Sequence, residues 1–405
     1  MNVPWTVERR FMAPLDSMFG MLDKIKSADI SVYQQRCVAV RNRNASCMRC
    51  AQACTSGAIS YDDNQLIIEP DKCIGCGTCA TMCPTCALEA HRPNDAELQR
   101  AVLAAAQKNG GVAVIACRQI VDAAGNMLDA SKVVAVECLG RIEESLITAC
   151  AVAGVSKVML VQGACAECDH AVGLETAQAA CDTANELLRV WDCPMRAKIV
   201  DRFPRDVRAP EGRAYDEVRR NFFFKVKDES KRIASTVVDE TLKEELGEKE
   251  PEEPRFIKVM DDGTLPHFIP DRRERLLDNL AALGEPSDEL IDVRLWGHVV
   301  INPDICNSCR MCATFCPTGA LRKFDEEDGT FGVDHYPGDC VKCRCCEDIC
   351  PTKALKVYDE VLTVDILDGG VERNEMRKPD INYESPKKGM FAMRKLLGFD
   401  EVYER

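Results

Sequence analysis

Long apolar segments are absent from this sequence of 405 residues. It contains no run of 18 or more apolar residues, which excludes a membrane-spanning helix of ordinary length. Its first 26 residues are interrupted by charged side chains and lack the apolar core of a secretion signal. We therefore expect a cytoplasmic protein whose thiols stay reduced.

The signatures of nucleotide binding and of hydrolysis are also missing. No G-x-G-x-x-G follows a strand-like segment, and neither G-x-x-x-x-G-K-[ST] nor His-Glu-x-x-His occurs. The formal net charge is −14, and no basic stripe is available to neutralise phosphates, so nucleic acid is a poor partner. We expect no catalytic centre for an organic substrate, and therefore not an enzyme in its own right.

Cysteine, in contrast, is abundant. The chain has 25 cysteines, far above average usage. In a chain that we expect to stay in a reducing compartment, such a number indicates metal ligation and not disulfides.

Eight of these cysteines form two regular runs between residues 306 and 351. Both runs match the bacterial ferredoxin pattern C-x2-C-x2-C-x3-C-P, in which the last cysteine of each run binds the other run's cluster. The resemblance implies two [4Fe-4S] clusters, and the spacing disfavours zinc knuckles and a disulfide framework. The implied ligands are set 3, with Cys306, Cys309, Cys312 and Cys350, and set 4, with Cys316, Cys340, Cys343 and Cys346. Cys345 falls between ligands and is interpreted as a spare thiol.

A second stretch of this kind, at residues 47–84, is imperfect. Its later half is complete and ends in Cys83-Pro84, but its earlier half has Asn44 where the first cysteine is usual. The same crossing rule implies set 2. Set 2 consists of Cys54, Cys73, Cys76 and Cys79, and the incomplete remainder consists of Cys47, Cys50 and Cys83.

The missing ligand of that remainder has several candidates. Cys37 lies ten residues before Cys47 and can reach back through a longer loop, so we predict set 1 as Cys37, Cys47, Cys50 and Cys83. A three-iron cluster without a fourth thiolate is the alternative. Cys86 stands where glycine is usual after Pro-Thr, and it is either a competing ligand or a small buried thiol.

From residue 96 the pattern changes to alternating helices and β-branched apolar segments. Strands are predicted at 112–117, 132–138, 157–165 and 197–200, and helices at 96–107, 142–154 and 173–191. This alternation predicts a parallel sheet covered by helices. Cys117, Cys138 and Cys165 each end a predicted strand, and Cys168 follows.

Ligands of open parallel sheets bind beyond the carboxyl ends of the strands. Cys117, Cys138, Cys165 and Cys168, here called the middle set, could therefore hold a [2Fe-2S] cluster. Zinc with His170 as an additional ligand is one alternative. The other alternative is that the middle set consists of ordinary buried cysteines, an interpretation that suits Cys150, Cys181 and Cys193.

The segment Cys138-Leu139-Gly140-Arg141, followed by Gly163 to Cys168, resembles the delta subunit of methyl-viologen-reducing hydrogenases over residues 110–195. That family has a CxxC pair at the end of its first strand, whereas Cys117 is followed by Arg118, Gln119 and Ile120. The resemblance implies a [2Fe-2S] cluster in this domain. It also implies partners of the hydrogenase, heterodisulfide reductase or formate dehydrogenase kind, together with a flavoprotein.

The predicted fold is a multidomain α/β and α+β protein. Two ferredoxin-like iron–sulfur modules flank a small parallel-sheet α/β domain of the flavodoxin or Rossmann type, and a charged helical linker completes it. The predicted boundaries are a helical segment at 1–35, a ferredoxin-like domain at 36–95, the α/β domain at 96–202, the linker at 203–290, a second ferredoxin-like domain at 291–360 and a C-terminal arm at 361–405. Within the linker, 270–283 is predicted to be helical.

Together these patterns predict an iron–sulfur electron-transfer subunit that relays electrons between redox partners in an anaerobic oxidoreductase complex. Its cofactors are expected to be four [4Fe-4S] clusters and one [2Fe-2S] cluster. An alternative is a redox enzyme that uses the middle-set cysteines for thiol or sulfur chemistry. A scaffold or cluster-delivery protein is a third interpretation.

Overall fold

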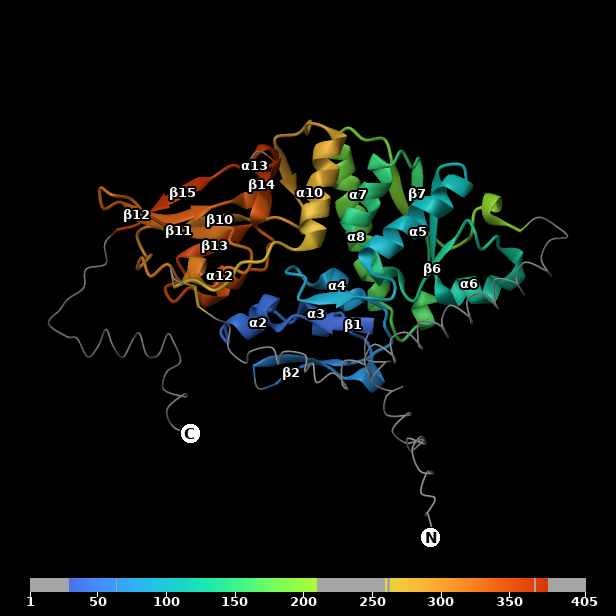
Figure 1. Cartoon of the computed structure of the whole chain (residues 1–405), viewed down its shortest axis with the longest axis horizontal. Coiled ribbons are helices and arrows are strands. Elements are labelled where there is room, and N and C mark those ends of the chain that lie inside the picture. The colour runs from blue at the N-terminus through green and yellow to red at the C-terminus, as the bar shows by residue number, and fades with distance from the viewer. Residues whose placement is uncertain (1–28, 63, 210–258, 261–262, 368, 378–405) are drawn as a thin grey trace, which may run out of the picture.

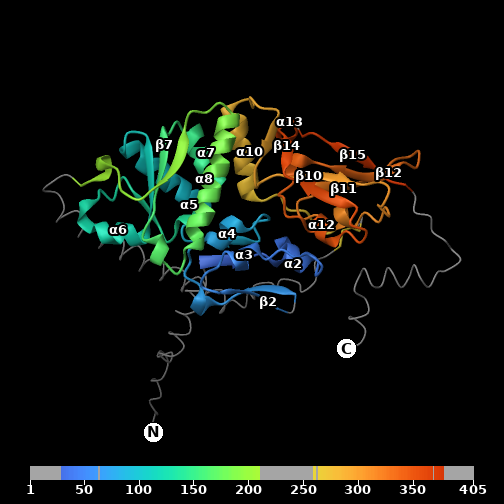
Figure 2. The ribbon, with the colours of Figure 1, turned by 180° about the vertical axis from the view of Figure 1, so that it is seen from behind.

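The computed structural model describes residues 29–62, 64–209, 259–260, 263–367 and 369–377. In this part the chain forms a middle α/β domain and two cysteine-rich units, and the first unit lies across the junction of the other two (Figures 1 and 2). Most of the predicted helical segment at 1–35, residues 210–258 of the predicted linker and residues 378–405 of the predicted C-terminal arm lie outside the described residues.

The middle domain is built on a four-stranded parallel sheet with the strand order β6-β5-β7-β8. Its strands are β5 (Val112–Cys117), β6 (Val134–Val136), β7 (Lys157–Val161) and β8 (Arg196–Val200). This is the order 2-1-3-4 of flavodoxin-like sheets. The predicted parallel sheet is therefore confirmed, but β6 and β7 end earlier than predicted.

The helices of this domain are α5 (Asp95–Lys108), α6 (Arg118–Ala124), α7 (Glu144–Val152) and α8 (Val172–Val190). Successive strand residues face opposite sides of a sheet. Ala113 and Ile115 accordingly pack with α5, α7 and α8, whereas Val114 and Ala116 pack with α6. The sequence analysis missed α6, since its seven residues are too few for a helical period to emerge.

Each cysteine-rich unit consists of short strands and short helices, and two helices of each unit carry one ligand candidate each. In the first unit these are β1 (Ile30–Val32), β2 (Ile59–Asp62), β3 (Gln65–Ile68) and β4 (Leu88–Ala90), with α2 (Val38–Arg41), α3 (Arg49–Gln52) and α4 (Thr78–Met82). The second unit has β9 (Leu290–Asp292), β10 (His298–Ile301), β11 (Leu321–Asp325), β12 (Phe331–His335), β13 (Leu355–Tyr358), β14 (Glu360–Leu362) and β15 (Glu372–Glu375), with α11 (Met311–Thr314), α12 (Cys345–Ile349) and α13 (Thr363–Leu367). The pairings β1–β4, β2–β3, β9–β14, β10–β13, β11–β12 and β12–β15 are all antiparallel.

The helix predicted at 270–283 is present as α10 (Asp271–Leu283), and it joins the domains. Leu276 and Leu280 are buried together with Trp191, which directly follows α8, and with Trp296 of the second unit. In Figure 1, α10 stands between α7 and the strands of the second unit. Although this region has the composition of a charged linker, α10 is a packed element of the core.

The first unit and the middle domain approach each other closely at two glycines. A Cβ atom added to Gly140 would lie 2.9 Å from Cα of Gly173 and would overlap the hydroxyl of Thr78. Thr78 begins α4, Gly140 follows the sheet and Gly173 lies in the first turn of α8. The Cys-x-Gly-Arg segment therefore has a packing reason for its glycine.

We expect Gly140→Ala to destabilise the protein by about 1–3 kcal/mol, because the backbone of Gly173 leaves no room for a methyl group. The midpoint of thermal unfolding of anaerobically purified protein measures this loss. Thr78→Ala should recover part of it in the double variant, since the threonine side chain is the other obstruction. A Gly140→Ala variant with the wild-type midpoint would contradict the close packing.

Candidate iron–sulfur sites

Three of the cysteine runs have the same tightly wound backbone. Left-handed residues occur between successive cysteines, at Gly75 and Gly77 for set 2, at Ser308 and Arg310 for set 3 and at Lys342 and Arg344 for set 4. Such turns reverse the chain within a few residues. They allow three thiols of one short loop to face a common centre.

The last cysteine of each run, which the crossing rule assigns to the other run's cluster, is followed by a turn of the same form in all four runs. The fourth residue of this turn is left-handed in all cases, at Gly57, Cys86, Gly319 and Lys353. A hydroxyl two residues after the cysteine lies near its sulfur, with Sγ–Oγ distances of 3.3 Å for Cys54–Ser56, 3.7 Å for Cys83–Thr85, 3.9 Å for Cys316–Thr318 and 3.8 Å for Cys350–Thr352. At this turn the imperfect first run therefore has the same local structure as the complete ones.

Backbone amides also point at the sulfurs. The N–H of Ala87 donates to Cys83 Sγ at 3.2 Å, and that of Ser308 donates to Cys306 Sγ at 3.4 Å. Hydrogen bonds of this kind stabilise negative charge on cluster ligands and tune the cluster potential. The donors therefore fit a ligated thiolate better than a free thiol.

In sets 2, 3 and 4 the thiols that the crossing rule groups together lie close to one another. Burial raises the pKa of Cys79, and its neighbours Cys76, Cys73 and Cys54 raise it further. Burial raises the pKa of Cys312 to about 12, and the other three thiols of set 3 add to this effect. The pKa of Cys346 is strongly raised, mainly by burial, and the nearby thiols of Cys343, Cys340 and Cys316 raise it further.

These raised pKa values have a chemical consequence. Four buried thiols in one place cannot all ionise at neutral pH unless a cation compensates for their charge. A bound metal supplies that charge and deprotonates coordinating thiols. The residues present therefore fit iron–sulfur clusters.

Set 1 is completed in space by Cys37. Burial raises the pKa of Cys37 to about 11, and the nearby thiols of Cys83 and Cys47 raise it as well. Burial raises the pKa of Cys50 to about 12, and here Cys83, Cys37 and Cys47 all contribute. The structure thus brings together the four thiols predicted for set 1, although ligation itself stays a prediction.

Asn44 does not share this environment, and Cys86 is near only one thiol of set 1, that of Cys83. Asn44 is exposed, and its backbone N–H donates to the side chain of Asn42. Cys86 is 4% exposed, and its sulfur accepts a hydrogen bond of 3.1 Å from Nε of Arg272. Cys86 therefore suits the interpretation as a buried thiol.

We expect Cys37→Ser to remove or convert one cluster only, with a loss of about one to four iron atoms per chain. Iron analysis and EPR of the reduced protein measure the change. Cys86→Ser is the matched control, because it alters a buried thiol of the same unit that is bound to an arginine. Unchanged iron content and EPR in Cys37→Ser would show that Cys37 is not a ligand.

The middle set lies at the carboxyl edge of the parallel sheet. Cys117 is the last residue of β5, and its Sγ donates to the carbonyl of Glu137 at 3.7 Å. Cys138 follows β6 by two residues, and Cys165 opens the short helix η6 (Cys165–Glu167), four residues after β7. The expectation that Cys138 and Cys165 end strands is therefore wrong in detail, because both strands stop where the sheet's hydrogen bonds stop.

The four thiols of the middle set are nevertheless neighbours. Burial raises the pKa of Cys165, with further contributions from Cys117 and Cys168. Burial raises the pKa of Cys138 to about 11, with Cys76 and Cys117 also raising it. The arrangement is compatible with a cluster that spans three sheet connections.

The zinc alternative for this set finds less support. Nδ1 of His170 lies 2.7 Å from the hydroxyl of Thr55 in the first unit, so this ring nitrogen is already engaged. Among the described residues, no three His, Cys, Asp or Glu side chains converge closely enough to hold a single metal ion. Ligands of an iron–sulfur cluster stand further apart, because they bind different iron atoms. Cys150 and Cys181 lie in the core, and Cys193 packs against it, as ordinary apolar residues do.

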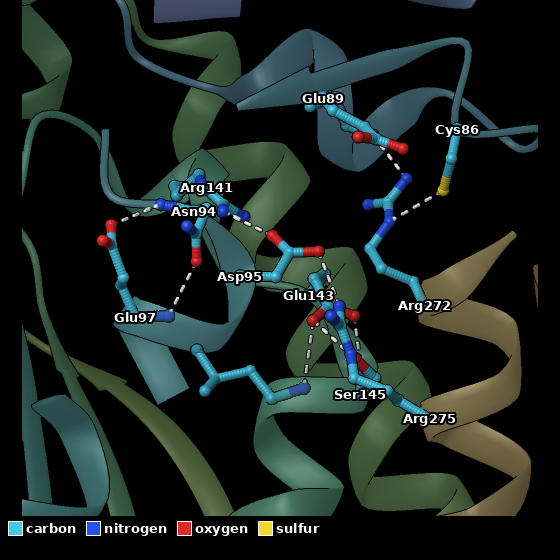
Figure 3. Close-up of polar contacts among 12 residues, drawn as sticks. Cys86, Glu89, Asn94, Asp95, Glu97, Arg141, Glu143, Ser145, Arg272 and Arg275 are labelled. Atoms are coloured by element: carbon cyan, nitrogen blue, oxygen red, sulfur yellow. Dashed lines mark hydrogen bonds and ion pairs between the residues drawn. The ribbon is translucent and has the colours of Figure 1, made fainter. Parts of the chain in front are cut away.

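A network of charges at the domain junction was not foreseen from the sequence. Asp95 at the start of α5 accepts hydrogen bonds from Arg141 and, at 2.6 Å, from Arg275 of α10 (Figure 3). Burial raises the pKa of Asp95, but the guanidinium groups of Arg141, Arg272 and Arg275 outweigh it and hold the pKa at about 2. Arg141 of the Cys-x-Gly-Arg segment thus fixes the loop after Cys138 to α5 and, through Asp95, to α10.

The five sets also lie next to one another in a fixed order. The hydroxyl of Thr78 is 3.5 Å from Cys76 Sγ of set 2 and hydrogen-bonds Cys138 of the middle set. Cys50 of set 1 lies close enough to Cys79 of set 2 to raise the pKa of Cys79.

The order continues into the second unit. Cys47 of set 1 and Cys343 of set 4 both pack against the small apolar group of Val38, Cys345 and Ile349, which joins the two units. Cys312 of set 3 raises the pKa of Cys346 of set 4. The sequence of sites is therefore the middle set, set 2, set 1, set 4 and set 3.

Comparison with known proteins supports iron–sulfur binding by the two cysteine-rich units. A short stretch of 52 residues is 38% identical to "Putative oxidoreductase AegA" of Escherichia coli (strain K12), covering 13% of this chain and 8% of that protein. No solved structure matches the chain, and no helix in the described part is long and apolar enough to cross a membrane. The pattern of the 4Fe-4S dicluster domain matches residues 45–87 and 298–354, so the chain carries two iron–sulfur dicluster regions of an electron-transfer type.

Proposed function

We propose that this chain is an electron-relay subunit of an anaerobic oxidoreductase complex of the hydrogenase, heterodisulfide reductase or formate dehydrogenase kind. The observation that carries the proposal is the unbroken series of five thiol sets from the middle domain to the second cysteine-rich unit. A bound iron–sulfur cluster supplies one-electron chemistry. The chain supplies the order, the spacing and the surroundings of the sites.

The residues between the sets are suited to this role. Thr78 connects the middle set to set 2, and α3 and α4 place Cys50 and Cys79 side by side. The contact between the two units is sealed by apolar side chains, with Cys345 and Ile349 1% and 7% exposed. Exclusion of water lowers the reorganisation that accompanies each change of charge.

Both ends of the series reach the surface. Cys309 of set 3 is exposed, and Ile305 beside it is 49% exposed. At the other end Cys165 and Cys168 of the middle set are partly exposed. We propose that one redox partner docks at each end, with a flavoprotein as one of them and a hydrogenase, formate dehydrogenase or heterodisulfide reductase subunit as the other.

Whether the middle set binds a cluster distinguishes the proposed relay from an enzyme that uses these thiols for sulfur chemistry. We expect reduced anaerobic protein to show a rhombic [2Fe-2S] EPR signal that disappears in Cys138→Ser, while the [4Fe-4S] signals remain. Cys150→Ser is the matched control, since it changes a buried cysteine of the same domain outside the set. If the wild type lacks that signal and Cys138 reacts readily with alkylating reagents, the thiol-chemistry alternative is favoured.

A further inference from the structure

Two arginines are buried on either side of set 4. Arg41 ends α2 of the first unit and is 4% exposed, and Arg273 of α10 is 6% exposed. Arg41 donates to the carbonyl of Cys316 at 3.2 Å, and Arg273 donates to the carbonyl of Cys340 at 3.3 Å. Both guanidinium groups thus contact the backbone of a set 4 cysteine.

Neither arginine has an anionic partner in the described part of the chain. The other acceptors are again carbonyls, of Gln35 for Arg41 and of Leu295 for Arg273, and Arg273 also stacks 4.3 Å above the ring of Trp296. Nε of Arg41 and Nη1 of Arg273 are buried without a hydrogen-bond partner.

The carboxylates nearest to Arg273 are already engaged. Glu144 is bound to Arg294 at 2.6 Å, and Asp339 is bound to Arg322 at 2.6 Å. Thiols are the remaining source of negative charge. Cys316, Cys345 and Cys343 favour the charged form of Arg41, and all but Cys345 belong to set 4. Cys340 of set 4 is the first of the groups that favour the charged form of Arg273.

A buried cation without a counter-charge is strongly unfavourable. Arginine does not solve this by losing its proton, because its pKa is too high. A site with four thiolates is anionic when loaded, since the thiolate charge exceeds that of the iron–sulfide core, and reduction makes it more so. A loaded set 4 carries the negative counter-charge that the two arginines otherwise lack.

We propose that Arg41 and Arg273 are the counter-ions of set 4 and make it the most easily reduced site of the series. This inference rests on the proposed relay and deepens it. Set 4 lies between set 1 and set 3, so an electron that enters from either end comes to rest at the contact of the two units. The relay then holds one electron per chain between transfers.

The other basic side chains around set 4 are either paired or less deeply buried. Arg49 donates to the carbonyl of Lys342 at 3.0 Å, but its side chain is only half-buried. Lys342 and Arg344, from the loop of set 4 itself, both bind Asp359 at 2.8 Å. Arg310 in the loop of set 3 binds Asp325 at 2.7 Å. A cation that is paired or partly exposed has a weaker effect on a nearby potential than a buried unpaired one.

The test is a redox titration of the anaerobic full-length chain followed by EPR. The set 4 component is identified as the one that Cys343→Ser removes. At the potential that half-reduces this component in the wild type, we expect Arg41→Met or Arg273→Met to lower its ratio of reduced to oxidised form about tenfold, which is a 59 mV shift for one electron. Methionine fills the buried space without charge, and Gln variants at the same positions provide a second neutral replacement.

Lysine variants and Arg344→Gln serve as controls. Arg41→Lys and Arg273→Lys keep the charge and should titrate near the wild type, and Arg344→Gln removes a paired charge and should do the same. An unmoved set 4 component in any neutral variant with full iron content overturns the inference, as does an equal shift in Arg344→Gln. If all neutral variants lose set 4 iron, retention of iron in both Lys variants supports the inference and its loss there overturns it. Wild-type protein without iron and sulfide would instead overturn the proposed function itself.

Discussion

Serine in place of Cys343 is expected to interrupt the proposed relay between the two cysteine-rich units. Cys343 belongs to set 4, which connects the first unit to set 3, and its loss leaves sets 1 and 3 without a centre between them. We expect the variant to lose about four iron atoms per chain, or about one if a three-iron cluster remains. Where set 4 is lost entirely, turnover of the complex isolated with its partners should fall below about a tenth of the wild-type rate, because electron transfer needs a series of closely spaced centres.

The matched control for this variant is Cys345→Ala. Cys345 lies in the same loop and is 1% exposed, but it belongs to no predicted ligand set. We expect it to keep the wild-type iron content and most of the turnover. Dithionite, which reaches the clusters from solution, should still reduce the remaining sets of Cys343→Ser. Wild-type turnover in a Cys343→Ser protein that lacks set 4 iron would show that electrons do not pass through this site.

Asp95→Asn is expected to cause the largest loss of stability among single substitutions at the domain junction. Asp95 accepts from Arg141, which is 5% exposed, and from Arg275 of α10. Removal of its charge leaves two guanidinium groups without their carboxylate, and breaking a buried ion pair in this way costs about 3–5 kcal/mol. We expect the contact between α5, α10 and the loop after Cys138 to open roughly 100- to 4,000-fold more often.

Amide hydrogen exchange of α5 and α10 measures this opening directly. A global unfolding midpoint is less informative, because a chain of several domains does not unfold in one step. Glu186→Gln is the control, since Glu186 pairs with Arg189 on the surface at 2.6 Å and such pairs contribute less than about 1 kcal/mol. Exchange in Asp95→Asn at the wild-type rate would mean that the junction does not depend on this carboxylate.

The sequence alone was sufficient to group most of the cysteines. Sets 2, 3 and 4 follow from spacing, because three thiols of each come from one short loop and the fourth precedes a turn of known form. Cys37 was harder, since it lies outside the matched residues 45–87 and reaches set 1 only through the fold of α2. The predicted parallel sheet also followed from local pattern, namely β-branched runs between helical segments.

The role of α10 could not be predicted from composition. Arg272 and Arg273 belong to a strongly charged region, and charged residues usually face solvent. Here Arg273 is buried and Arg272 half-buried, because the turns around Cys83 and Cys340 present backbone carbonyls to them. Those acceptors exist only after both cysteine-rich units have folded against the middle domain.

The positions at which the strands of the middle domain end were also predicted inaccurately. Apolar residues continue beyond the last sheet hydrogen bond, so the segment that ends in Cys165 looked like one strand, whereas β7 stops at Val161. The thiols still meet, because the connections after β5, β6 and β7 leave the same edge of the sheet. The topology was predictable from the pattern, but the position of each sulfur depended on loops that have no sequence period.

Iron and acid-labile sulfide content of the anaerobically purified chain tests the central claim most directly. Four [4Fe-4S] clusters and one [2Fe-2S] cluster predict about 18 iron and about 18 sulfide per chain, in brown protein. Colourless protein without labile sulfide, even after reconstitution with iron and sulfide, would show that these thiols do not hold clusters.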